Sequence, residues 1–242
     1  MIGRTARTTF AAVAAALTVF AGVASAGPST TDSSGNVLII DVEVSPPLPR
    51  SGATIVYHAF FGNRDGGALP READNEIKLA KGFRLHGRDF ATCPLPEQAS
   101  EVGQDRCSRR AKVGEGTFEA DARPALADRV TGTLEIYNGE SRHGNPTLIL
   151  LADANVGAET VETELDYEYA GSTLGRLALP EGSPSGLFVV TKIELELGAV
   201  RRGKSYVETP RRCRKVWRFS ETSFFEDGGS ITAHDKAPCV KV

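Results

Sequence analysis

The sequence lacks most of the motifs by which hydrolases and cofactor-dependent enzymes are recognised. It has no H-E-x-x-H pair and no phosphate-binding glycine loop, and the segment 182–186 (GSPSG) has proline where a nucleophile elbow needs serine. The histidines are scattered without a metal-ligand spacing to one another or to a cysteine, at His58, His86, His143 and His234. We therefore expect no metal and no cofactor, and the balance favours a protein without catalytic activity.

Long apolar runs are also missing, apart from one near the N-terminus. The 14-residue apolar stretch Phe10–Val23 follows Arg4 and Arg7 and precedes the small-residue cleavage site 24–26 (ASA). A membrane-spanning helix needs about 20 residues, so the stretch predicts a secretory (Sec) signal peptide, residues 1–26, cleaved after Ala26. No later run is long enough to span a membrane. We expect the mature chain to be secreted into the extracellular space.

Cysteine is rare but even in number, with Cys93, Cys107, Cys213 and Cys239. In a secreted chain this number favours two disulfides, which four cysteines can form in three ways. Proximity in the sequence favours Cys93–Cys107 and Cys213–Cys239. On the loop-entropy model the two would contribute roughly 3 and 3.5 kcal/mol.

Acidic residues outnumber basic ones only slightly. The signal peptide holds two of the 28 basic residues and none of the 31 acidic ones, so cleavage leaves a net charge of −5. This mild acidity gives no reason to expect general affinity for nucleic acid.

Strand patterns recur along the mature chain between clusters of Gly, Pro, Asn and Asp. The clearest is Leu187–Leu197. There Val189, Thr191, Ile193, Leu195 and Leu197 alternate with Val190, Lys192, Glu194 and Glu196, which predicts one face in the core and one in water. Residues 27–36 are polar and predict a flexible lead-in, and Leu95–Val102 is the one short helix candidate. The remaining predicted strands are Val37–Ser45, Ala53–Phe61, Ile77–Leu85, Val113–Ala120, Val130–Tyr137, Thr147–Ala154, Glu164–Tyr169, Leu174–Leu179, Val216–Phe225 and Ser230–His234.

About ten short strands with almost no helix predict an all-β fold in a single domain over residues 37–242. We expect one antiparallel β-sandwich of Greek-key or jelly-roll type, with a β-barrel as the alternative.

One strand concentrates carboxylates. Residues two apart on a strand share a face, so Glu164, Asp166 and Glu168 line up on one side of it. The segment resembles the E-[IL]-D-x-E signature of the secreted family 16 β-glucanases. The resemblance implies a retaining hydrolase with Glu164 as nucleophile, Asp166 as its assistant and Glu168 as acid/base. It covers about six residues, and the chain has one tryptophan where those enzymes have many aromatics. An amphipathic strand with a solvated acidic face is the simpler interpretation.

Basic residues gather between Arg201 and Arg218, where Glu208 is the one acid. Arg211, Arg212, Arg214 and Lys215 are the candidate anion-binding residues. Trp217 and Phe219 alternate with their neighbours, which is typical of core positions rather than of a stacking surface.

Several short segments together resemble a family of secreted, two-disulfide β-rich proteins from high-GC Gram-positive bacteria. They are 90–93 (FATC), 112–116 (KVGEG), 130–134 (VTGTL), 137–139 (YNG), 204–210 (KSYVETP) and 217–219 (WRF), with Cys107, Cys213 and Cys239. The resemblance implies a β-sandwich with two local disulfides and supplies no activity.

The sequence thus favours a secreted, non-enzymatic binding or structural module of the cell envelope or extracellular space. The candidate partners are an envelope polymer, a glycan or another secreted protein, with no nucleic acid and no membrane span in the mature chain. The carbohydrate hydrolase is the first alternative, and a polyanion binder using residues 201–218 is the second.

Overall fold

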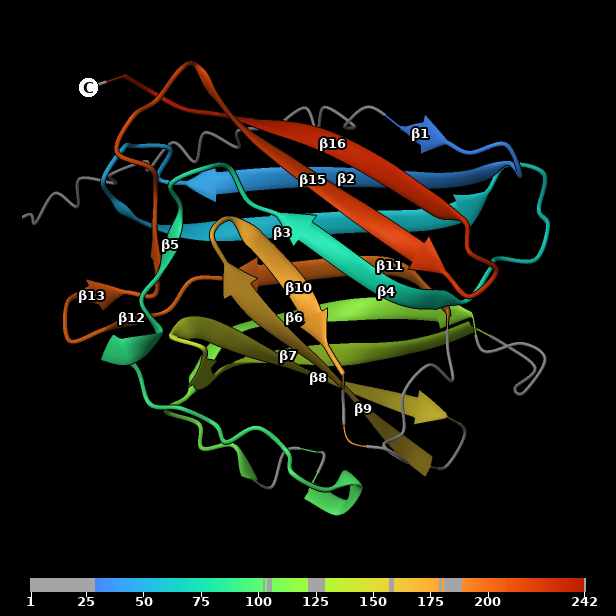
Figure 1. The fold of residues 1–242 in the computed structure, drawn as a ribbon, viewed down its shortest axis with the longest axis horizontal. Helices are drawn as coiled ribbons and strands as arrows, with labels where there is room; N and C mark the ends of the chain where they lie inside the picture. The colour runs from blue at the N-terminus through green and yellow to red at the C-terminus, as the bar shows by residue number, and fades with distance from the viewer. Residues whose placement is uncertain are drawn as a thin grey trace, which may run out of the picture.

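The structure is a computed structural model that describes residues 29–101, 103, 106–121, 129–156, 159–178, 180 and 189–241. The predicted signal peptide lies outside the described residues. Nearly all regular structure is strand (Figure 1). The strands are β1 (Thr30–Thr31), β2 (Asn36–Ser45), β3 (Gly52–Asn63), β4 (Glu72–Lys78), β5 (Arg84–Leu85), β6 (Lys112–Asp121), β7 (Arg129–Arg142), β8 (Asn145–Val156), β9 (Glu159–Ala170), β10 (Thr173–Leu177), β11 (Val189–Leu197), β12 (Val200–Arg201), β13 (Lys204–Ser205), β14 (Val207–Glu208), β15 (Val216–Phe225) and β16 (Ser230–Pro238).

The main sheet is antiparallel and curves until its ends nearly meet. Its strand order is β1-β2-β3-β11-β6-β7-β8-β9-β10-β4-β15-β16, and β16 lies beside β2 (Figure 1). The Val42 amide of β2 donates a hydrogen bond to Asp235 Oδ2 of β16 at 2.7 Å, which links the two ends of the sheet. The all-β, antiparallel prediction is confirmed. Because one sheet encloses the core, the arrangement is nearer to the predicted barrel alternative than to two separate facing sheets.

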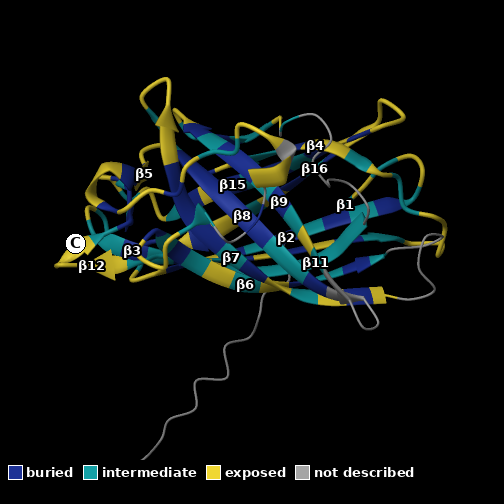
Figure 2. Ribbon diagram, turned by 90° about the horizontal axis from the view of Figure 1, so that it is seen from below, coloured by how far each residue is buried: buried dark blue, intermediate teal, exposed yellow. Residues whose placement is uncertain are grey.

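The core fills the inside of this curved sheet. On β2, Leu38, Ile40, Val42 and Val44 face inward and are buried, as the period of two of a strand requires. At the end of the sheet where β2 finishes and β15 begins, the ring of Phe83 packs against Trp217 and Phe219, with centroid separations of 5.4 and 5.6 Å. Figure 2 shows buried residues along the strands and exposed ones mainly in the connections. At the end of the sheet where β2 finishes, the core is therefore filled by the rings of Phe83, Trp217 and Phe219.

A loop closed by a disulfide covers the outer face of β7, β8 and β9. Cys93 and Cys107 are bonded, and Cys93 packs with Tyr137, Ile149 and Leu151 in a separate small core. Within the predicted helix Leu95–Val102 the described residues form only a 3-10 turn, Ala99–Glu101, because the loop is held by contacts to the sheet rather than by helical bonds. The second disulfide joins Cys213 to Cys239. Both pairings favoured by sequence proximity are present.

Two segments differ from expectation for local reasons. The sequence predicts a flexible lead-in over residues 27–36. Within the described residues 29–36, however, β1 pairs with β2, and the Asp32 carboxylate accepts bonds from the Ser34 and Asn36 amides. The predicted strand Ile77–Leu85 is divided, because Gly82 adopts a φ of 100° between β4 and β5. Within the described residues, no helix is long and apolar enough to cross a membrane.

Candidate functional site: a cavity inside the sheet

The core contains a largely enclosed cavity of about 120 Å³. One water molecule needs roughly 10–15 Å³ of such space, so the cavity has room for a small organic molecule. It lies at the end of the sheet opposite the packed aromatic rings, near the start of β2 and the end of β15. Most of its wall is apolar and comes from β3, β6, β7, β8, β9 and β11.

Small side chains explain why space remains there. Ala59, Ala152 and Ala154 line the cavity and point inward from β3 and β8. Gly132 of β7 lies opposite Ala154, and a Cβ there would meet the Asp153 carbonyl oxygen at 2.1 Å. Strand β7 therefore has no room for a side chain larger than that of glycine at position 132. The alanines of β3 and β8 that line the same space are also small, so part of the interior stays empty.

One wall of the cavity is polar and comes from β3, β4, β9 and β15. Tyr167 donates its hydroxyl to Asn75 Oδ1 at 2.8 Å, and Asn75 Nδ2 donates to Glu221 Oε1 at 3.5 Å. The hydroxyl of Tyr57 donates to the other oxygen of Glu221. All four side chains are buried. Buried polar groups of this kind are costly unless they are bonded, and here they bond mainly to one another.

A second carboxylate, Glu72, lies beside this network. Burial raises the pKa of Glu72 to about 7, and the nearby charge of Glu221 adds to the rise, while a bond from Ser223 and the charge of Arg176 oppose it. Burial also raises the pKa of Glu221, against the bonds from Tyr57 and Asn75. The wall therefore places two carboxyl groups with raised pKa values in an otherwise apolar chamber, and the pKa of Glu72 lies near neutral pH.

This arrangement is suited to binding. An apolar chamber with a few converging polar groups is the usual form of a small-molecule site. The carboxyl, amide and phenol groups can accept and donate hydrogen bonds and so fix the orientation of a guest. Among the described residues no group of three or more His, Cys, Asp or Glu side chains is placed to hold a metal ion.

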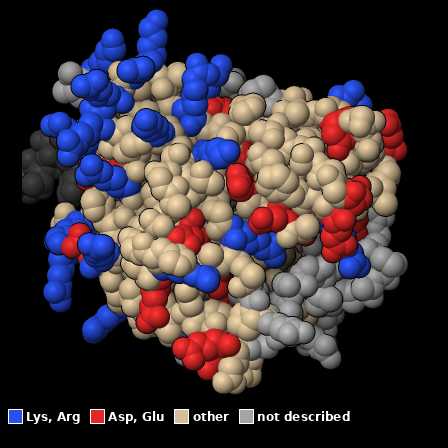
Figure 3. All heavy atoms as spheres, viewed as in Figure 1, with Lys and Arg blue, Asp and Glu red and all other residues tan. Residues whose placement is uncertain are grey.

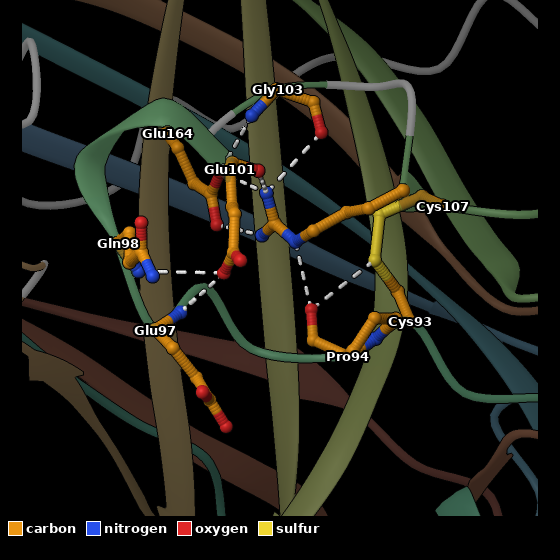
Figure 4. Close-up of polar contacts among 9 residues, drawn as sticks. Cys93, Pro94, Glu97, Gln98, Glu101, Gly103, Cys107 and Glu164 are labelled. Carbon is orange, nitrogen blue, oxygen red and sulfur yellow. Dashed lines mark hydrogen bonds and ion pairs between the residues drawn. A yellow bond between two sulfur atoms is a disulfide. The ribbon is translucent and has the colours of Figure 1, made fainter.

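The acidic strand predicted from the sequence lies outside the chamber. Glu164 and Asp166 point to the outer face of β9, where the disulfide loop covers them, and both are buried. Arg106 from the loop forms an ion pair with Glu164, with Nη1 at 2.8 Å from Oε2, and the Gly103 amide donates to the same oxygen at 3.1 Å (Figure 4). The expected solvated acidic face is thus wrong for these two residues: both are covered by the loop, and Glu164 holds the loop against the sheet.

Burial has a consequence for the pKa of Asp166. Desolvation raises that pKa, and the charge of Glu164 raises it further, against the opposing charge of Arg106.

Glu168, the third carboxylate of the strand, is half-buried and accepts a bond from Asn145 Nδ2 at 2.6 Å. A retaining hydrolase needs a nucleophile and an acid/base that both face the substrate. A Glu164 that is covered and already paired with arginine weighs against that hypothesis.

The basic candidates Arg211, Arg212, Arg214 and Lys215 are all exposed in the connection before β15. Trp217 and Phe219, which follow them, are buried in the core as expected from their alternation. The structure keeps the basic candidates together at the packed end of the sheet, remote from the cavity.

Sequence reasoning missed the residues of the polar wall, although one signal was available. On β15, Trp217, Phe219 and Phe225 point inward, and Glu221 and Ser223 occupy the same alternating face. A carboxylate on an inward-facing position of a core strand indicates a buried functional or paired group. The partners Tyr57, Asn75 and Tyr167 lie on distant strands, and no local pattern connects them to Glu221.

Comparisons with known proteins give no relatives: no protein-family model, no curated protein and no solved structure matches the chain.

Proposed function

We propose that the protein is a secreted, non-enzymatic binding module that holds a small molecule in the cavity inside its sheet. The guest has an apolar body, which replaces the unfilled space beside Ala59, Ala152 and Ala154, and a hydrogen-bond donor that reaches the polar wall. The two disulfides and the predicted signal peptide support an extracellular place of work. The observation that carries the proposal is the chamber with a buried acceptor, Glu221, at one side.

The polarity of the wall sets the expected preference among guests. Glu72 and Glu221 bring negative charge or lone pairs into a poorly solvated space, so an anionic group on the guest is repelled. Arg176 also lines the cavity and offsets part of that charge, so the guest needs no full positive charge. A neutral donor, such as a hydroxyl or an N–H group, meets both conditions.

The test uses three fluorescent or competing probes of similar shape. N-phenylnaphthylamine has an apolar body and an N–H donor, phenylnaphthalene lacks the donor, and anilinonaphthalene sulfonate adds an anion. We expect the first to bind at micromolar concentration and the other two at least about tenfold more weakly. Phenylnaphthalene leaves a buried acceptor without its donor, which costs about 1–3 kcal/mol, and the sulfonate brings its negative charge beside the carboxyl groups of the wall. A preference for the sulfonate would contradict the proposal.

A pair of leucine substitutions, one inside the cavity and a matched control outside it, tests where the probe binds. Ala152→Leu places three more carbon atoms in the chamber, whereas Thr131→Leu adds apolar volume on the exposed face of the neighbouring strand β7. We expect Ala152→Leu alone to abolish binding of N-phenylnaphthylamine, with both variants retaining the far-UV spectrum and the disulfides. Equal binding by the two variants would place the probe elsewhere on the protein.

A further inference from the structure

The packed end of the sheet carries a dense set of exposed basic side chains, which we term the basic pole. Its core is the connection between β14 and β15 together with the β12–β13 hairpin. Figure 3 shows Lys and Arg gathered along the side of the molecule where these segments lie. The exposed members in these two segments are Arg201, Arg202, Lys204, Arg211, Arg212, Arg214 and Lys215.

The connection is held in one shape by three bonds to two other parts of the chain, the C-terminal segment and the β2–β3 connection. The Cys213–Cys239 disulfide ties it to the C-terminal segment, and the Cys239 amide donates to the Lys215 carbonyl at 3.0 Å. The Arg50 amide donates to the Pro210 carbonyl at 3.2 Å. The basic side chains therefore project from a fixed backbone, so less chain entropy is lost when they contact a ligand.

Positive charge in the basic pole is almost unopposed. Lys204 is its one member with an ion-pair partner among the described residues, Asp89. Glu208, the one acid of the segment, is bonded to His86 at 2.9 Å instead. Clustered like charges destabilise a fold through mutual repulsion, and a chain with net charge −3 has acidic residues available for pairing. Their absence here indicates that the charge is directed at something outside the chain.

The backbone supports the same conclusion. Among the described residues four other than glycine have a positive φ, and three are basic residues in or beside the basic pole: Arg50 at 53°, Arg202 at 50° and Lys215 at 83°. Glycine or asparagine would adopt this conformation at lower cost. Strained backbone positions cluster at active sites and ligand-binding sites, and these three lie in or beside the basic pole.

The chemistry of the ligand follows from what lies beside the charges. Tyr206 and Trp217, the nearest aromatic residues in the sequence, are buried, so they cannot stack on nucleic-acid bases or form an aromatic belt at a lipid interface. Arginine predominates over lysine, and its planar fork suits phosphate, sulfate or carboxylate oxygens.

We infer that the basic pole binds a linear polyanion without aromatic groups, in which each repeat unit carries a phosphate, sulfate or carboxylate group. The site is independent of the cavity, which lies at the opposite end of the sheet. The charges come from two separate segments, the hairpin and the β14–β15 connection, so an elongated, regularly charged polymer can pair with more of them than a small anion can.

The test measures binding of polyphosphate, and of polygalacturonate as a carboxylate polymer, over a range of salt concentrations. The variant Arg211→Gln/Arg212→Gln/Arg214→Gln removes three charges from the basic pole. The control Arg64→Gln/Arg71→Gln/Arg129→Gln removes three exposed charges from the opposite end of the sheet. We expect the first variant to lose at least about tenfold in affinity for both polymers and about 2–3 units of the slope of log K against log salt, and the control to change affinity less than about threefold.

Three outcomes would overturn the inference. The two variants could lose affinity equally, which would mean that net charge alone drives binding. Homopolymeric single-stranded DNA could bind more tightly than polyphosphate of equal charge, which would assign the site to nucleic acid. Vesicles of phosphatidylglycerol could retain the protein at a salt concentration that releases both polymers, which would assign the site to a membrane surface.

Discussion

Removal of the Arg106 side chain tests the interpretation of the acidic strand most sharply. The guanidinium donates to Glu164 and also to the carbonyl oxygens of Pro94, Glu101 and Gly103. Arg106→Ala leaves the Glu164 carboxylate, which is fully buried, without its guanidinium partner, while the hydrogen bonds to the Gly103 amide and to Asp166 remain. Breaking a buried ion pair from one side costs about 3–5 kcal/mol, a large share of the roughly 5–15 kcal/mol that stabilises a typical domain.

Urea unfolding with both disulfides intact measures this cost. With an m value of about 2–3 kcal/mol/M, a loss of about 4 kcal/mol lowers the midpoint by about 1.5 M. The double variant Arg106→Met/Glu164→Gln removes both charges, so we expect it to recover at least half of the loss. An Arg106→Ala midpoint within about 0.2 M of the parent would refute the reasoning, because it would mean that the carboxylate is solvated or unpaired in solution.

Three further predictions concern the cavity and the second disulfide. Tyr57→Phe removes the hydroxyl that donates to Glu221 and should lower the free energy of unfolding by about 1–3 kcal/mol in urea, and an unchanged value would contradict the network. Because burial raises the pKa of Glu72 from 4.5 to about 7, the folded chain binds more protons than the unfolded chain in that window. Stability should therefore fall by up to about 3 kcal/mol as pH rises through it, and Glu72→Gln should flatten the pH profile of unfolding; a profile unaffected by the substitution would refute the assignment. Cys213→Ala/Cys239→Ala should lower the melting temperature, with a loss of about 3–4 kcal/mol, and should weaken polyphosphate binding by freeing the β14–β15 connection; intact affinity would show that the connection needs no anchor.

Local patterns in the sequence were enough for most of the long strands and for the disulfides. The alternation in Val216–Phe225 and Val37–Ser45 depends only on which side of a strand faces water, and both segments are strands in the structure. The cysteines pair with their neighbours in the sequence, so proximity was a sufficient guide. Closure of the sheet was harder to predict, since β2 and β16 lie at opposite ends of the chain and meet through the bond from Val42 to Asp235.

The acidic strand shows why a surface pattern can mislead. Glu164, Asp166 and Glu168 alternate with apolar residues, which predicts one face in the core and one in water. The inner face is as predicted, but the outer face, with Glu164 and Asp166, is covered by a loop that begins about 70 residues earlier in the chain, at Cys93. Nothing in the strand itself encodes that cover; the complementary charge is Arg106, inside the disulfide loop.

The cavity was beyond the reach of sequence patterns for a related reason. Its space results from alanines on β3 and β8 and a glycine on β7, and each of these residues is ordinary in its own segment. Its polar wall joins Tyr57, Asn75, Tyr167 and Glu221, which become neighbours only when the sheet curves. The volume of the cavity and the meeting of these polar side chains arise from the closed sheet and not from any single strand.

A crystal structure of the protein saturated with N-phenylnaphthylamine tests the central claim most directly. The account predicts the probe inside the curved sheet, with its rings against Ala59, Ala152 and Ala154 and its N–H group directed to the wall that holds Glu221. Probe density confined to the outer surface, for example against the exposed ring of Phe60, with the chamber unchanged, would contradict it.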